Sequence, residues 1–171
     1  FLMYYFNGLG LAYNDARSHL DIGRRIVDNL KPGFGQIGSV WLPLPHLLML
    51  LTIWNEFMWH SGLSGALQSM AAFVFTGILI YQFLKRLSVG LFGRFAGVGI
   101  FATNINILYM QSTAMTELLL LATMTAGAYE LMMWHKQETI FRLIKAAFWI
   151  MMATLIRYDG WFLFLFALLL I

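Results

Sequence analysis

The sequence predicts an all-α fold: a polytopic transmembrane helical bundle with an amphipathic extracytoplasmic first loop. Three observations predict it. Of the 171 residues, 60% are hydrophobic and only 11% are charged, whereas a soluble domain carries about 25% charge. The mean hydropathy is +0.73. The apolar residues gather in runs bounded by charge, so the apolar excess is expected to face lipid, and a soluble all-helical core is the poorer alternative.

The rest of the composition excludes several classes of function. The net charge is +3, and the eleven basic residues form no stripe interleaved with aromatic side chains, so no nucleic-acid partner is expected. Cysteine is absent, which excludes disulfides and thiolate metal sites. Phe1 and Ile171 both lie inside apolar sequence, so we expect a fragment of a larger membrane domain. No signal peptide is identified.

The predicted spans follow one another along a single transmembrane domain, 1–171. A span needs about 20 apolar residues, or fewer where neighbouring helices bury it. Residues 1–13 are expected to be the end of a first span, and 14–65 an extracytoplasmic loop with interfacial helices. The remainder, 66–171, is expected to hold about five further spans, the last of them incomplete, at 66–84, 95–110, 117–134, 141–156 and from Trp161 onward.

The run from 46 to 59 is too short to span a membrane. Its apolar core, LLMLLTIW, has eight residues and is followed by Asn55 and Glu56. Tryptophan favours the headgroup layer, and proline interrupts a helix. We therefore expect an amphipathic helix lying at the interface, introduced by two prolines and flanked by three tryptophans: Pro43, Pro45, Trp41, Trp54 and Trp59.

Counting crossings assigns the loops to two faces. Loops 14–65, 111–116 and 157–160 share one face, and loops 85–94 and 135–140 share the other. The basic residues divide six to five in favour of the second face, which the positive-inside rule places in the cytoplasm. We therefore expect a multi-pass protein of the plasma (inner) membrane whose polar site lies on the extracytoplasmic face.

The charged first loop begins with a predicted helix from Asp15 to about Leu30. Apolar residues recur at helical spacing, Asn14 or Asp15 is expected to cap the helix, and KPGFG is expected to end it. Asp15 and His19 then share one face, and Asp21 is expected to pair with Arg25 across one turn. An aspartate at a helix start is more often a cap than a catalytic group.

Three further ionisable residues are predicted on the face that carries Asp15. Glu117 begins a span in YMQSTAMTELLLL, and Arg157 and Asp159 interrupt apolar sequence in LIRYDGWFLF. Each has an ordinary structural role open to it: favouring a helix dipole, snorkelling, or forming a turn. Their convergence on one face with Asp15 nevertheless favours a polar site.

Such a site has two possible uses. A carboxylate can accept a proton from an attacking hydroxyl while arginines hold a departing phosphate, or the same groups can bind a transported ion or solute. The histidines at 19, 46 and 60 match no metal-binding spacing, so no cofactor is expected, and a divalent metal with Asp15 is not favoured.

The order of these motifs resembles the C superfamily of integral-membrane glycosyltransferases, of the family 39 type that includes protein O-mannosyltransferases and aminoarabinose transferases. The matching stretches are YNDARSHL, GSVWLPLPHLL, LKRLSVGLFGRFAG, YMQSTAMTELLLL and RYDGW, which cover essentially the whole chain. The chain departs from the family at Asn14, where many relatives carry a second acid, and at Leu42, where aminoarabinose transferases carry a lysine.

The resemblance implies a hexosyl or pentosyl transferase that uses a polyprenyl-phosphate sugar donor, with a lipid, glycan or protein as acceptor. It implies that Asp15 is the base of an inverting displacement. The residues expected to bind substrate or the donor phosphate are Asn14, His19, Arg24, Arg25, His46, Glu117, Arg157 and Asp159. The alternative is a transporter or lipid flippase, which the absence of repeats and the confinement of all three prolines to the first loop disfavour.

Overall fold

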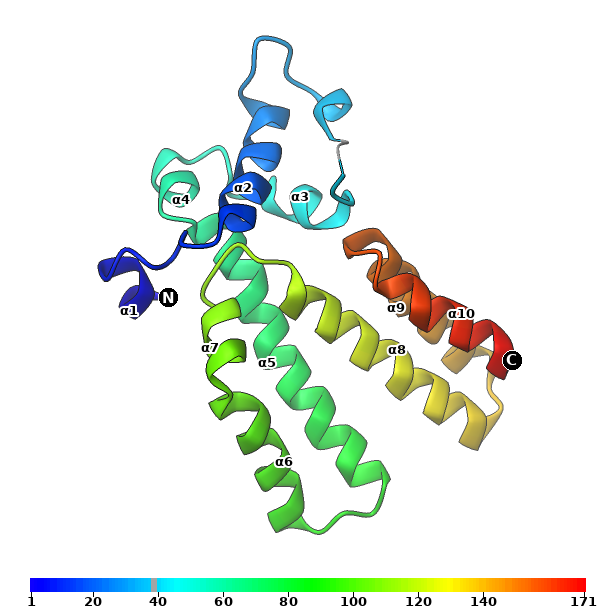
Figure 1. Cartoon of the computed structure of the whole chain (residues 1–171). Coiled ribbons are helices and arrows are strands. Elements are labelled where there is room, and N and C mark those ends of the chain that lie inside the picture. The colour runs from blue at the N-terminus through cyan, green and yellow to red at the C-terminus, as the bar shows by residue number, and fades with distance from the viewer. Residues whose placement is uncertain (38–39) are drawn as a thin grey trace.

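The computed structural model describes residues 1–37 and 40–171 and is all helical, with no strand in these ranges (Figure 1). The predicted all-α class is therefore confirmed. The longer helices are α5 (Leu63–Arg86), α6 (Leu91–Thr103), α8 (Glu117–Gln137), α9 (Ile140–Ile156) and α10 (Gly160–Leu170). The others are α1 (Leu2–Phe6), α2 (Asn14–Val27), α3 (Leu44–Met49), α4 (Glu56–His60) and α7 (Ile105–Met110), with a 3-10 turn at Phe34–Gln36.

The long helices form a bundle with two distinct ends. α5 contacts α6 and α8, and α9 contacts α8 and α10. The segments 14–37, 40–62, 111–116 and 157–159 meet at one end, which we call the polar end. Ser69 near the start of α5, for instance, donates to the Met115 carbonyl at 2.9 Å. At the opposite end, Lys136 donates to the Arg86 carbonyl at 3.3 Å. These are the two groups of loops that the sequence assigns to opposite faces.

Helix length and composition distinguish α5 from the other described helices. It has 24 residues and is the one helix in the described ranges that is long and apolar enough to cross a membrane. α6 and α10 are apolar but shorter, at 13 and 11 residues. The segments predicted at 66–84, 117–134 and 141–156 all lie within observed helices.

The segment predicted as one span at 95–110 is broken at Asn104. Its backbone is extended (φ −65°, ψ 123°), so α6 ends at Thr103 and α7 starts at Ile105. The Asn104 side chain accepts from the backbone N–H groups of Asn106 and Ile107 at 3.0 and 3.2 Å. An asparagine that caps a new helix thus replaces the helical hydrogen bonds that the break removes.

The segment predicted as one helix at 46–59 forms α3 and α4 instead. Asn55 starts α4 by accepting from the Met58 N–H at 3.0 Å. The carbonyls of Ile53 and Trp54, between the two helices, both accept from Arg24 Nη1, at 3.1 and 2.9 Å. A charged donor from α2 therefore satisfies the backbone groups that a continuous helix would have used, and neither helix is long enough to span.

The first helix is also shorter than expected for the end of a span over residues 1–13. α1 ends at Phe6, and Gly8 adopts a left-handed conformation (φ +70°) that turns the chain. The chain then returns to α7, where the Tyr109 hydroxyl donates to the Leu9 carbonyl at 3.1 Å.

The polar end has an apolar core that fixes α2 and α3 on the bundle. It includes Ala16 and Leu20 of α2, Met49 of α3, and Ala114 before α8. A Cβ built on Gly65 would lie 2.3 Å from the Ala114 Cβ, so only glycine permits this approach of α5 to the 111–116 segment. This packing holds the ionisable residues of three separate segments at one end of the bundle.

Candidate functional site

An ionic cluster joins the start of α8 to the turn between α9 and α10. Arg157 Nη1 donates to Glu117 Oε1 at 3.0 Å, and Arg157 Nε donates to Asp159 Oδ2 at 3.0 Å. The Arg157 and Glu117 side chains are partly buried, at 31% and 29% exposure, and Asp159 is more exposed. The three residues that the sequence places on one face are therefore in direct contact.

A hollow of about 260 Å³ lies beside this cluster. Arg157, Tyr158 and Asp159 line one side, and Trp41 and Leu42 of the first loop line the other. Residues 38–39 of the GSVWLPLPHLL motif lie outside the described residues. The hollow thus combines a guanidinium, an indole ring and apolar side chains, a lining that suits a phosphate attached to an apolar group.

His19 and His46 form a buried pair next to this hollow. His19 Nδ1 lies 3.0 Å from His46 Nε2, and the side chains are 3% and 0% exposed. Burial lowers the pKa of His19 to about 4, aided by the charge of Arg157, and burial also lowers the pKa of His46 to about 4, aided by the neighbouring His19. Both rings are therefore neutral at pH 7, and one donates to the other.

The Trp41 ring connects the histidine pair to the hollow. Its centroid is 4.5 Å from that of His19, and the indole also lines the hollow beside Arg157. The sequence identifies Trp41 only as an interfacial tryptophan. Its proximity to His19 depends on the path of the first loop, which no local pattern specifies.

Asp15 lies exposed in the first turn of α2, one helical turn before His19. The predicted cap is wrong, because Tyr13 occupies the N-cap position and neither Asn14 nor Asp15 makes a side-chain cap hydrogen bond. Asn14 begins the helix, and its carbonyl accepts from Ser18 Oγ at 3.1 Å. Within the described residues, no hydrogen bond joins Asp15 to the ionic cluster. Asp15 precedes His19 by four residues, so the two positions lie on the same side of α2, with Asp15 exposed and His19 buried.

A second, larger hollow of about 730 Å³ lies on the other side of Glu117. Tyr13, Asn106 and Tyr109 are among the residues that line it. Glu117 Oε2 is buried and has no hydrogen-bond partner among the described residues, whereas Oε1 is held by Arg157. Glu117 therefore forms part of the larger hollow and also holds the guanidinium that lines the smaller one. Tyr13 directly precedes Asn14 in YNDARSHL, and no sequence pattern marks it or Tyr109 as part of a site.

The partners of the Arg24 guanidinium lie outside both hollows. Besides the two carbonyls in the 53–54 segment, it bonds the carboxylates of Asp28, at 2.6 Å, and Glu56, and lies 4.8 Å from the centroid of the Trp59 ring. The hydrogen bonds that Arg24 donates to Asp28, chiefly, and to Glu56 raise its already high pKa. Its guanidinium ties α2 to the 53–56 segment.

Arg25 is exposed on α2, and its Nε donates to the Asp21 backbone carbonyl at 3.2 Å. The predicted side-chain pair between Asp21 and Arg25 is wrong. Asp21 pairs with Arg17 at 3.2 Å, one turn in the other direction, and accepts from Trp59 Nε1 at 3.0 Å. The Arg25 charge still contributes to the lowered pKa of His46, although burial is the largest cause.

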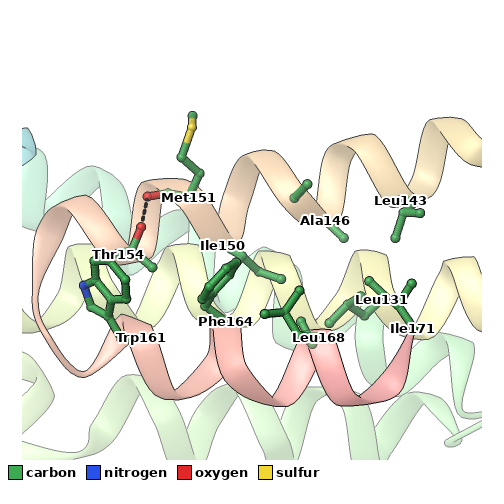
Figure 2. Close-up of a pocket in the computed structure, with 12 residues that line it drawn as sticks. Leu131, Leu143, Ala146, Ile150, Met151, Thr154, Trp161, Phe164, Leu168 and Ile171 are labelled. Carbon is green, nitrogen blue, oxygen red and sulfur yellow. Dashed lines mark hydrogen bonds between the residues drawn. The ribbon is translucent and has the colours of Figure 1, made fainter.

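A third hollow, of about 250 Å³ between α8, α9 and α10, has an almost wholly apolar lining (Figure 2). Its single hydroxyl, from Thr154, donates to the Met151 carbonyl at 2.7 Å. The other polar side-chain atom of the lining is the Trp161 indole nitrogen, so the lining offers a substrate no charge.

Within the described ranges, no three histidine, cysteine or carboxylate residues lie close enough together to hold a metal ion. No protein-family model, curated protein or solved structure matches the chain. The chemistry of the site therefore has to be inferred from its own residues.

Proposed function

We propose that this chain is part of the membrane domain of a glycosyltransferase of the C superfamily. It would transfer a sugar from a polyprenyl-phosphate donor to a lipid, glycan or protein acceptor at the extracytoplasmic face of the plasma membrane. The observation that carries the proposal is the cluster at the polar end, where Glu117 and Asp159 hold Arg157 beside a hollow at the same end as Asp15.

The distribution of side-chain sizes supports a location in the membrane. The buried residues of α5 are mostly small, among them Gly65, Ser69 and Ala72. Large apolar side chains point outward: Phe166 and Leu169 of α10 are 69% and 85% exposed. Small residues between helices and large apolar residues outside are typical of helices packed in lipid, where burial in the protein has no hydrophobic advantage over burial in the bilayer.

The proposed reaction uses the cluster for the leaving group. Asp15 accepts the proton of an acceptor hydroxyl while that oxygen attacks the anomeric carbon of the donor. The bond from the anomeric carbon to the phosphate oxygen breaks, and the phosphate leaves with the electron pair. Arg157, positioned by the two carboxylates, stabilises its charge. Attack opposite to the leaving group inverts the anomeric configuration.

Neutralising Asp15 tests the proposal. In the full-length protein, Asp15→Asn is expected to lower sugar transfer from a polyprenyl-phosphate donor by a hundredfold to ten-thousandfold, about the usual contribution of a general base. The thermal midpoint should change little, because the Asp15 side chain makes no cap hydrogen bond. Glu138→Gln is the control, because Glu138 is exposed at the opposite end of the bundle and its side chain makes no hydrogen bond within the described residues. Normal folding with most of the activity retained would exclude Asp15 from the mechanism.

Topology offers an independent test, since the chain has no cysteine of its own. Tyr158 is 61% exposed at the polar end, and Lys136 is exposed at the opposite end. Single cysteines at these two positions are expected to react with a membrane-impermeant reagent from opposite sides of the membrane. Labelling of both from one side would contradict the proposed crossing pattern.

The interruption at Asn104 favours a second candidate, a transporter or lipid flippase. Broken helices are typical of transport sites, although this break lies near the polar end, six residues before the end of α7. In proteoliposomes, a transporter would move a polyprenyl-phosphate sugar across the bilayer without consuming it, whereas the proposed enzyme would release the polyprenyl phosphate. Movement without cleavage would decide for the second candidate.

A further inference from the structure

A groove of about 480 Å³ runs along α8 between α5 and α9 and is separate from the hollows beside Glu117 and Arg157. Leu48 and Leu51 border it at the polar end, and Ala122 of α8 lines it. Trp149 of α9 lines it as well and meets Phe75 of α5, with ring centroids 5.4 Å apart. No ionisable side chain lines it, so the groove suits an uncharged group rather than a phosphate.

The groove contains one polar side chain whose hydrogen bonds are missing. The hydroxyls of Thr52 and Ser64 are 2.7 Å apart and satisfy each other, and the Thr123 hydroxyl donates to carbonyls of its own helix. The amide of Gln68 differs: both Nε2 and Oε1 are buried, and neither has a partner among the described residues. A buried amide without partners is unfavourable, so an occupant that pairs with it would be bound selectively.

The unpaired amide specifies what that occupant carries. Nε2 requires an acceptor and Oε1 requires a donor, and a free hydroxyl next to an ester carbonyl supplies both. Gln68 is five residues from the start of α5, or about 7 to 8 Å along the helix axis. With the start of α5 taken as the outer membrane surface and polar layers roughly 5 to 7 Å thick, that depth is close to the boundary between headgroups and hydrocarbon, where glycerol esters lie.

We propose that this groove binds an uncharged glycerolipid with a free hydroxyl, of the diacylglycerol kind. The hydroxyl and an ester carbonyl pair with Gln68, and one acyl chain lies along α8 towards Trp149. The inference rests on the proposed membrane location but not on sugar transfer, and its test measures binding alone.

The test compares two lipids and two variants of the purified protein in detergent. The lipids are dioleoylglycerol and its 3-O-methyl ether, which lacks the hydroxyl donor. The variants are Gln68→Leu and, as the matched control, Gln137→Leu, because Gln137 is exposed at the opposite end of α8. Bound lipid is measured by mass spectrometry after gel filtration, and stability by the thermal midpoint with and without lipid.

Wild type and Gln137→Leu are expected to bind dioleoylglycerol about tenfold more tightly than the ether, the effect of roughly one to two hydrogen bonds. Gln68→Leu should lose this preference. Without lipid, Gln68→Leu should unfold at a temperature at least as high as wild type, because the substitution removes an unpaired buried amide. With dioleoylglycerol, the thermal midpoint should rise more for wild type than for Gln68→Leu.

Three results would overturn the inference. The first is equal binding of the two lipids by wild type, including binding of neither. The second is a preference that survives in Gln68→Leu. The third is a change from dimer to monomer in Gln68→Leu, which would show that the amide pairs with a second copy of the chain.

Discussion

The buried histidine pair makes stability depend on pH in a way that can be calculated. The pKa of His19 and that of His46 are each lowered from 6.5 to about 4, chiefly by burial. Between these pH values the unfolded chain binds protons that the folded protein does not. The free energy of unfolding therefore falls as the pH falls from 6.5 towards 4, by about 3 kcal/mol for each histidine at the lower limit. Stability from this source is complete above pH 6.5.

The pair can be replaced by groups that do not titrate. Asn at position 19 offers an amide near the place of His19 Nδ1, and Gln at position 46 offers one near His46 Nε2, so the double variant His19→Asn, His46→Gln retains hydrogen-bonding atoms there. Its free energy of unfolding, measured by denaturant titration in detergent, is expected to vary much less than that of wild type between pH 6.5 and 4. His60→Gln is the control, because His60 is exposed and pairs only with Glu56 within the described residues. Equal slopes for wild type and the double variant would refute the assignment of the acid sensitivity to this pair.

Three further substitutions test the packing. Gly65→Ala places a Cβ against Ala114 and should lower the free energy of unfolding by about 1 to 3 kcal/mol, measured by denaturant titration. Arg142→Ala removes the 2.7 Å partner of Glu130, which is 8% exposed, and should lower the free energy of unfolding by about 3 to 5 kcal/mol. A loss below about 1 kcal/mol would contradict a stabilising role for this ion pair. Arg24→Gln should increase hydrogen exchange of the 50–56 segment more than that of α8, and uniform exchange would contradict its role as a local tie.

The ends of the long helices were predictable because charge marks them. Glu117 begins α8 and Arg157 follows α9, as the sequence suggests, and counting helices from there brings both residues to one end. That parity predicts a shared end, and the structure adds the direct contacts of Arg157 with Glu117 and Asp159. The uninterrupted apolar sequence predicts α5, which has 24 residues.

The first loop was less predictable because distant hydrogen bonds determine its path. His19 and His46 are 27 residues apart and meet only because α3 is short and turns back onto α2. Arg24 of α2 donates to the carbonyls of Ile53 and Trp54, 29 and 30 residues away, in the segment between α3 and α4. Neither contact has a periodic signature. The break at Asn104 did have a local signal, an asparagine able to cap a helix, but the apolar pattern around it favoured a single span.

The ionic cluster has a structural explanation that acts together with the proposed function. Glu117 is in the first turn of α8 and Arg157 directly follows the last turn of α9, so both helix dipoles favour these charges.

If the helix dipoles were the only reason for the cluster, each charged donor in it would be expected to have a partner within the cluster. Arg157, however, donates through Nε and Nη1, while its Nη2 makes no hydrogen bond within the described residues and the side chain lines the hollow with Trp41. A guanidinium held at Nε and Nη1, with Nη2 still available to donate, is preorganised to bind an anion. Arg157→Ala should therefore weaken use of the phosphate-linked donor more than it lowers the folded yield. Equal losses in both would leave the helix dipoles as the sufficient explanation.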